Sequence, residues 1–477
     1  MLQQLINGLI LGSIYALLAL GYTMVYGIIK LINFAHGDIY MMGAFMGYYL
    51  INHLHLNFFL ALLIAMLGSA FLGAVIEYLA YRPLRKSTRI AALITAIGVS
   101  FLLEYGMVYL VGADTRAFPQ AIHTVKYNLG PITITNVQLI ILGIALLLML
   151  TLQFIVQKTK MGKAMRALSV DSDAAQLMGI NVNRTISFTF ALGSALAGAG
   201  GVLIGLYYNS VQPLMGVTPG LKAFVAAVLG GIGAYAVAII GVKMPTYVGF
   251  LIAILVGTLV AGGIALGVGI PTLRLKGDYL AIATLGVAEI IRILLVNGGD
   301  ITNGAAGIMG IPPFTTWSLV YGVAVVSLIL AMNFLRSPLG RNTIAIREDE
   351  IAAESMGVDT TKVKVIVFVF GAILASIAGS LQAGYVGTVM PKDFSFMMSV
   401  NVLIIVVLGG LGSMTGTVLA AILLGLLNML LQDYASVRMI IYALALILIM
   451  IFRPSGLLGT KELTLSHLFR KTSKGGN

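Results

Sequence analysis

Two polar loops contain the residues whose types and spacing could recognise a binding partner. Residues 162–179 read GKAMRALSVDSDAAQLMG, and residues 340–357 read GRNTIAIREDEIAAESMG. The offset between them, 340 minus 162, is 178, and it aligns both terminal glycines, the central aspartate and the alanine pair. Packing alone does not require one polar sequence twice between apolar segments. We interpret the repeat as a docking surface presented twice to a partner with two-fold symmetry.

Each loop has the form x-Ala-Ala-x-x-x-Gly, running from Asp173 to Gly179 and from Ile351 to Gly357. Two alanines followed by glycine predict a short helix that another protein can approach closely and that the glycine caps. A short helix on a loop can sit in a groove of a partner. The alternative is a plain helix–turn–helix connector.

The sequence contains no recognisable motif for catalysis or nucleotide binding. The nearest fragment to a phosphate-binding loop, Gly162-Lys163-Ala164, lacks the hydroxyl that would hold magnesium. Histidines and acids do not occur at metal-ligand spacing, no nucleophile lies near a base, and there is no cysteine. We therefore predict that the chain is not an enzyme and binds no metal or cofactor, so its energy source lies in another chain.

Several polar residues interrupt apolar sequence and are candidates for a pore or gate. Asn33, His36 and Asp38 lie between the first two apolar segments, and Glu104 lies within a later one. Ionisable groups at membrane depth are functional candidates by default. The alternative for the first group is a tight turn, in which Gly37 supplies the bend and Asp38 caps the next helix.

Other features have structural interpretations. Glu289 and Arg292 are three residues apart and predict an ion pair on one helix. We expect Lys222 to extend to the outer membrane surface. The Gly-Gly-x-Gly runs at 230–233 and 409–412 predict helix breaks, either as pore elements or as close-packing hinges.

Composition makes the bilayer the main solvent of this chain. Of its 477 residues, 59% are hydrophobic and 10% are charged, with a mean hydropathy of +1.01. Since apolar segments of about 20 residues can cross a membrane only as helices, we predict an all-α polytopic membrane protein of two pseudo-repeated bundles with about 13–14 such segments. They are expected near 4–29, 34–51, 57–80, 90–111, 136–157, 185–208, 217–233, 246–270, 278–296, 316–335, 363–387, 395–410, 413–431 and 438–452.

We attribute the net charge of +12 to the enrichment of basic residues in cytoplasmic loops rather than to nucleic acid binding. Basic residues concentrate in 82–89, 158–184, 336–364 and the tail from 453, which we place in the cytoplasm, with the N-terminus outside. No Lys or Arg occurs in the first 29 residues, so the first apolar segment is expected to be a retained helix. Successive loops of a membrane protein lie on alternate sides of the bilayer. The segments predicted between residues 217 and 270 do not satisfy this alternation.

Six motifs resemble permeases of branched-chain amino acid ABC importers. The runs 7–16, 32–38 and 173–181 are similar to LivH-type permeases, and the runs 273–282, 302–308 and 453–459 are similar to LivM-type permeases. The resemblance divides the chain into a LivH-like half at 1–233, a truncated fusion junction at 234–246, a LivM-like half at 247–460 and a cytoplasmic tail at 461–477.

The resemblance implies a permease in the inner membrane of a bacterium or archaeon. It implies two ATPase subunits that bind ATP and magnesium, an extracytoplasmic substrate-binding protein, an amino-acid substrate, and alternating access between two halves with substrate passing between them. Its coupling loops would contain Asp173, Ala174, Ala175 and Gly179, and Ala352, Ala353, Glu354 and Gly357. Ile351 departs from the acidic first position of that motif, so Glu348, Glu350 or Glu354 would supply the charge instead.

Two other functions remain open at this point. An ion-coupled secondary transporter is also built from repeats, but it needs charged residues at the membrane midplane, and these are sparse here. A chain damaged at the junction would be a non-transporting fusion.

Overall fold

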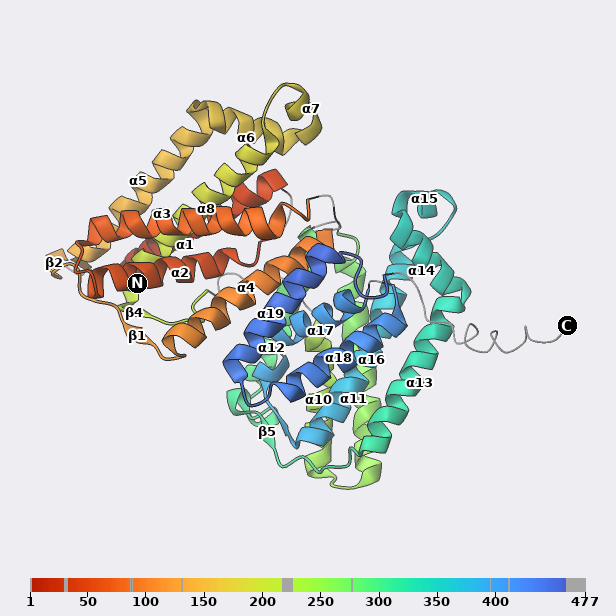
Figure 1. Cartoon of the computed structure of the whole chain (residues 1–477). Helices are drawn as coiled ribbons and strands as arrows, with labels where there is room; N and C mark the ends of the chain where they lie inside the picture. The colour runs from red at the N-terminus through yellow and green to blue at the C-terminus, as the bar shows by residue number, and fades with distance from the viewer. Residues whose placement is uncertain are drawn as a thin grey trace. The chain divides into compact units, whose positions relative to one another are not determined.

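The computed structural model describes residues 2–29, 33–85, 87, 89–129, 132–216, 226–275, 278–394, 396–410 and 412–459. The chain forms two compact units, and the first comprises residues 1–221 and 405–477. Its helices are α1 (Leu2–Ile29), α2 (His36–Asn52), α3 (Phe58–Ile76), the π-helix η1 (Glu77–Tyr81), α4 (Arg89–Val111), α5 (Asn136–Lys158), α6 (Lys160–Val170), α7 (Ser172–Leu177), α8 (Val182–Tyr208), α18 (Met414–Leu430) and α19 (Ala435–Phe452) (Figure 1).

The second unit comprises residues 222–404. It contains α10 (Ala226–Lys243), α11 (Tyr247–Thr272), α12 (Asp278–Val296), α13 (Trp317–Arg336), α14 (Pro338–Glu348), α15 (Glu350–Ser355), α16 (Thr360–Val386), most of α17 (Phe396–Gly409) and the 3-10 helices η2 (Gly299–Ile301), η3 (Gly304–Ala306) and η4 (Pro391–Phe394). The predicted all-α membrane fold is confirmed, because eight of the described helices are long and apolar enough to cross a bilayer.

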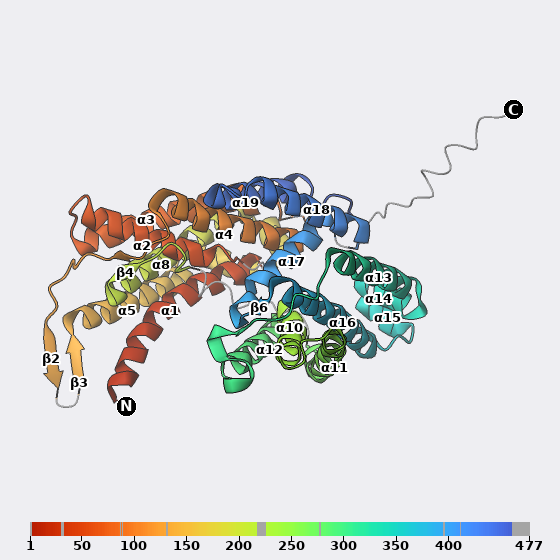
Figure 2. The same ribbon diagram turned by 90° about the horizontal axis from the view of Figure 1, so that it is seen from below.

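The described strands are short antiparallel pairs outside the long helices. They are β1 (Arg116–Ala117) with β4 (Ser210–Val211), β2 (Lys126–Leu129) with β3 (Ile132–Thr135), and β5 (Ile308–Met309) with β6 (Thr388–Val389). Figure 2 shows the β2–β3 hairpin beside the N-terminal end of α1. The Gln3 side-chain amide donates a hydrogen bond to the Thr133 carbonyl at 3.0 Å, which fastens the hairpin to α1.

In the first unit, α8 is the central helix and packs against α1, α2 and α3. Small residues permit this approach. A Cβ added to Gly21 of α1 would lie 2.7 Å from the Gly193 carbonyl oxygen of α8, and a Cβ on Gly43 of α2 would overlap with Gly198. Close backbone contact of this kind is what stabilises helix pairs in lipid, where both partners are as apolar as their solvent.

The end of the described chain completes this first unit. Helix α19 packs along α4. At their crossing, a Cβ on Gly98 of α4 would lie 3.3 Å from the Ala443 carbonyl oxygen and 3.5 Å from the Leu446 Cβ of α19. Residues more than 300 positions apart therefore share one helix interface.

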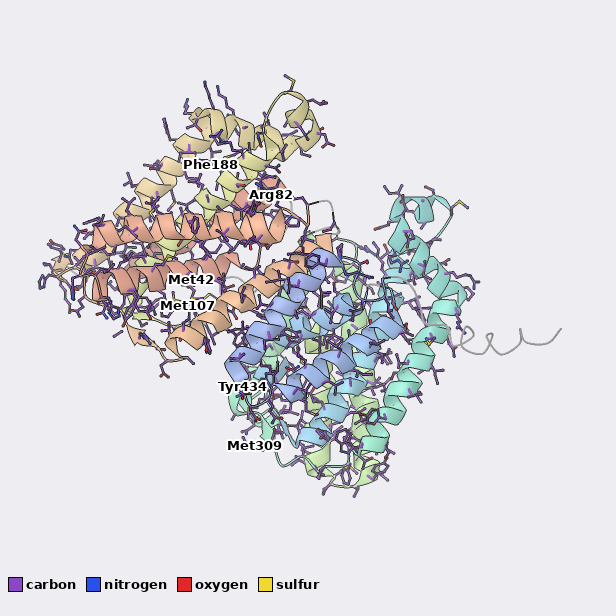
Figure 3. All side chains as sticks on the ribbon, viewed as in Figure 1. Met42, Arg82, Met107, Phe188, Met309 and Tyr434 are labelled. Atoms are coloured by element: carbon purple, nitrogen blue, oxygen red, sulfur yellow. The ribbon has the colours of Figure 1, made fainter. Side chains whose placement is uncertain are left out.

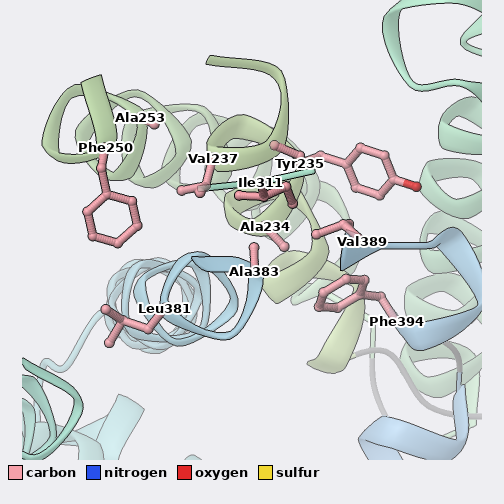
Figure 4. Close-up of a cluster of buried hydrophobic side chains, with 11 residues drawn as sticks. Ala234, Tyr235, Val237, Phe250, Ala253, Ile311, Leu381, Ala383, Val389 and Phe394 are labelled. Carbon is pink, nitrogen blue, oxygen red and sulfur yellow. The ribbon is translucent and has the colours of Figure 1, made fainter. Parts of the chain in front are cut away.

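The second unit repeats part of this plan. Helices α10 and α11 pack against α16 and against each other, as α2 and α3 do around α8. Figure 4 shows the buried cluster formed where they meet, which includes Tyr235 of α10, Phe250 of α11, Leu381 of α16 and Phe394. The two units thus use equivalent central helices.

The predicted helix break at 230–233 is wrong. Helix α10 continues through this Gly-Gly-Ile-Gly run to Lys243. The glycine is used for packing, since Gly233 lies so close to the Ser376 backbone of α16 that a Cβ would overlap with it. The second run does break a helix, because α17 ends at Gly409 and Gly410 has a φ of +115°.

Most predicted segments match helices within a few residues, as 136–157 matches α5. The segment 217–233 differs at its end, since α10 continues to Lys243. Residues 217–225, which include Lys222, lie outside the described residues, so the predicted position of that lysine stays a prediction. Residues 234–243 of the predicted junction form the C-terminal part of α10.

Candidate functional site

Each repeated loop begins with a sharp corner after a long helix. Thr159 caps α6 by accepting a hydrogen bond from the Gly162 amide at 3.0 Å, and Ser337 caps α14 by accepting one from the Gly340 amide at 3.1 Å. Both glycines lie against carbonyl groups of the preceding helix, where a Cβ would overlap. The aligned glycines are therefore needed for the turn.

The aligned aspartates cap the short helices α7 and α15. Asp171 Oδ1 accepts hydrogen bonds from the amides of Asp173 and Ala174 at 2.9 and 3.0 Å. Asp349 Oδ1 makes the equivalent bonds at 2.9 and 3.0 Å to the amides of the second and third residues of α15. Such caps satisfy amides that a helix start leaves without partners. The capping role of these two residues was missing from the sequence interpretation.

The glycines that follow the two short helices adopt the predicted capping conformation. Gly179 has a φ of +80° and Gly357 a φ of +85°, which is the left-handed region that favours glycine. The residue after each glycine donates its amide to a carbonyl inside the helix, Ile180 to Ala175 and Val358 to Ala353, both at 3.1 Å. The two loops therefore share one local structure as well as one sequence.

One alanine of each pair anchors its short helix, and the other is exposed. Ala175 and Ala353 are buried, whereas Ala174, Ala352, Asp173 and Glu354 are exposed. The tips are apolar as well as exposed, since the exposed fractions of Leu177, Met178 and Met356 lie between 83% and 88%. Apolar side chains held on rigid tips outside the long helices form a surface suited to a protein groove.

Acidic residues around the second loop have partners of their own. Glu350 forms an ion pair with Lys364 of α16 at 2.8 Å, and Glu348 pairs with its neighbour Arg347. Glu354 lies within the motif, is exposed, and could supply the charge that Ile351 lacks.

A buried ion-pair network connects the first loop to the bundle. Glu77, at the end of α3, is fully buried and pairs with Arg85 and, at 3.7 Å, with Arg82 (labelled in Figure 3). It also accepts a hydrogen bond from Ser187 of α8 at 2.5 Å, while Arg85 donates one to Asn183. These contacts hold the start of α8, directly after the loop. Sequence reasoning missed Glu77, although an acid eight residues before Arg85 in an apolar segment is a usable signal.

The candidate gate residues at the start of α2 are buried rather than exposed in a channel. Asn33 and His36 are each 2% exposed. Asn33 Oδ1 accepts a hydrogen bond from the Tyr81 hydroxyl at 2.8 Å, and His36 Nε2 lies 3.2 Å from the Leu18 carbonyl oxygen of α1. The His36 ring also contacts Tyr22 edge to face, with 5.9 Å between ring centroids.

Asp38 and Glu104 lie close together, although sequence spacing does not predict this pairing. Both are 1% exposed, and the Ser100 hydroxyl of α4 donates a hydrogen bond to Asp38. Glu104 lies one turn further along α4 and interacts with both. The alternative in which Asp38 caps α2 is wrong, because the structure has no side-chain cap there. Two buried carboxyl groups in contact are stable only with a proton or a cation between them.

Polar atoms without a partner gather in this cluster. Asn33 Nδ2, His36 Nδ1 and Asp38 Oδ1 are buried and make no hydrogen bond in the described part of the chain. Buried polar atoms of this kind usually bind water or a ligand. The described residues contain no group of three metal-ligating side chains. The Glu289 side chain lies outside the described residues, so its pairing with Arg292 stays a prediction.

Comparison with known proteins matches both halves of the chain to one family. The family model for the branched-chain amino acid transport system permease component matches residues 4–247 and again residues 231–452. The two matches overlap at residues 231–247, which include most of α10 and end at the first residue of α11. No solved structure matches.

Individual relatives agree with the division into halves. The first half is 42% identical, over 258 residues, to the high-affinity branched-chain amino acid transport system permease protein LivH of Escherichia coli (strain K12), covering 50% of this chain and 82% of the relative. The second half is 38% identical, over 292 residues, to the corresponding protein LivM of Salmonella typhimurium (strain LT2), covering 54% of this chain and 67% of the relative. The chain therefore belongs to the family of branched-chain amino acid transport system permease components, with a LivH-like half followed by a LivM-like half.

Proposed function

We propose that this permease moves branched-chain or related amino acids inward as the membrane subunit of an ABC importer. The observation that carries the proposal is the pair of loops with identical caps and exposed apolar tips, in a chain whose two halves match one permease family. One chain would then supply both halves of the transport path.

Separate ATPase subunits would bind these loops, one at α7 and one at α15. ATP and magnesium would be held by those subunits, and this chain would contribute no catalytic group. ATP-driven closure of the ATPase pair would draw the two loops together and switch the substrate path between the two sides of the membrane. Both loops would face the cytoplasm, with the N-terminus outside, in an inner membrane. A binding protein outside would deliver the amino acid.

The buried Asp38–Glu104 pair favours a second candidate, an ion-coupled secondary transporter. Carboxyl groups inside a bundle are typical of proton relays. Uptake of radiolabelled leucine by cells that produce the chain together with candidate ATPases and a candidate binding protein distinguishes the two. An ABC importer stops when ATP is depleted and continues when an uncoupler collapses the proton gradient at maintained ATP. The reverse pattern assigns a secondary transporter. Absence of uptake by a folded, membrane-inserted chain assigns a non-transporting fusion.

A further inference from the structure

An apolar groove runs between α13 and α16 in the second unit. It has a cavity volume of about 610 Å³. Residues on both helices line it, among them Trp317, Val320 and Ala324 of α13 and Leu374, Ala378 and Leu381 of α16.

The equivalent place in the first unit is filled by α1. The offset of 178 that aligns the repeated loops also aligns α5 with α13 and α8 with α16. Helix α1 packs against both α5 and α8. It approaches α8 at Gly193, where a Cβ would lie 2.9 Å from the Gly21 carbonyl oxygen, and at Gly200, where a Cβ would lie 3.7 Å from the Ile14 carbonyl oxygen.

The corresponding positions in the second unit are uncovered. Gly371 aligns with Gly193, and a Cβ there would meet nothing within 4 Å. Ala378, which lines the groove, aligns with Gly200. Small residues thus occupy both sites of helix approach, although no described helix of the second unit uses them.

Helix α13, which lines one side of the groove, is also less covered than α5, its equivalent in the first unit. On α5, Ile141 and Ala145 are 0% exposed, whereas none of the residues of α13 is buried. The second unit supplies α10 and α11 in the places of α2 and α3, and none of its described helices takes the place of α1. The groove therefore has the shape and the small residues of a helix site whose helix lies elsewhere.

We propose that this groove binds a transmembrane helix of a separate membrane polypeptide. The partner is an apolar helix of α1 type, with glycine or alanine facing Gly371. A second copy of this chain is a poorer source, because its own α1 is already packed against its α8 at Gly193. The gain in stability comes from close van der Waals contact at the small residues, which lipid tails provide less well.

Disulfide trapping tests this directly, because the chain has no cysteine. The probe is a synthetic peptide of residues 2–29 with Gly21→Cys, reconstituted in liposomes with the Gly371→Cys chain and oxidised. Gly371→Cys fits the available space, so the variant is expected to fold. We expect a peptide–chain adduct at least five times more abundant than with Ile329→Cys, which is 52% exposed on α13 and is not among the residues that line the groove.

One further variant tests the groove directly. Adding Ala378→Leu to Gly371→Cys should fill the groove and abolish the adduct. Equal adducts at Gly371→Cys and Ile329→Cys would overturn the proposal and leave lipid as the occupant. Dimers of the unmodified chain that Ala378→Leu dissociates would overturn it in favour of a second copy. None of these readouts depends on transport.

Discussion

The Ser100 hydroxyl donates a hydrogen bond to the Asp38 carboxyl and so joins α4 to the first turn of α2. Both side chains are almost fully buried, and Glu104 lies beside them. The bond is therefore part of the internal structure of the first unit as well as part of a candidate transport site.

Removing this hydroxyl should destabilise the first unit. Ser100→Ala removes one hydrogen-bond donor from a buried carboxyl group, which costs about 1–3 kcal/mol. Thermal unfolding in detergent should show a lower Tm than for Ser13→Ala, the matched control, whose hydroxyl bonds only to its own helix at Ile10. Equal Tm values for the two variants would mean that the bond contributes nothing.

Helix α19 should be fixed to α4 by an engineered disulfide. A Cβ on Gly98 would lie 3.5 Å from the Leu446 Cβ, which is within the range that a disulfide requires. The double variant Gly98→Cys, Leu446→Cys should form an intramolecular bond and migrate faster in a denaturing gel. Gly106→Cys, Leu446→Cys is the control, because the Gly106 site contacts nothing within 4 Å. An unlinked first pair would contradict the assignment of α19 to the first unit.

The capping glycines of the two loops should tolerate asparagine and reject valine. Their positive φ values are accessible to asparagine, whereas an ordinary side chain there is strained by roughly 1–2 kcal/mol. With Gly179→Val and Gly357→Val together, co-purification with co-expressed ATPase subunits should fall at least tenfold. The variants Gly179→Asn and Gly357→Asn should retain it. Full recovery of the ATPases with the valine variants would argue against coupling through these loops.

Breaking the Glu77 network should damage the support of the first loop. Glu77→Gln leaves Arg85 without its buried counter-charge, and removal of one partner from a buried pair costs about 3–5 kcal/mol. The variant should lose more thermal stability than Glu348→Gln, which breaks an exposed pair worth about 0–1 kcal/mol. Similar small losses in both variants would show that Glu77 is not a structural anchor.

Local features of this fold were predictable, and long-range ones were not. The apolar segment 136–157 predicted α5 because bilayer thickness and backbone hydrogen bonding leave few alternatives. The cost of a buried charge singled out Glu104. Its partners could not be predicted, because helix periodicity does not say which helix faces which. The packing of Gly98 against Leu446 is hidden for the same reason.

Glycine runs were the least informative signal. The sequences at 230–233 and 409–412 are nearly the same, yet one continues a helix and the other ends one. The difference lies in the surroundings, since Gly233 packs against Ser376 and Gly410 contacts Gly459. The sequence around each glycine run does not show which distant residues pack against it.

The packing of α19 against α4 has a consequence for biosynthesis. Helices α1 to α8 of the first unit are synthesised long before α19, which packs on α4. The face of α4 that packs on α19 therefore has no partner until the second unit has been synthesised, although α4 can already contact α2 and η1. A chain truncated after residue 412 should thus lack the helix that packs on α4 and expose that face of the first unit.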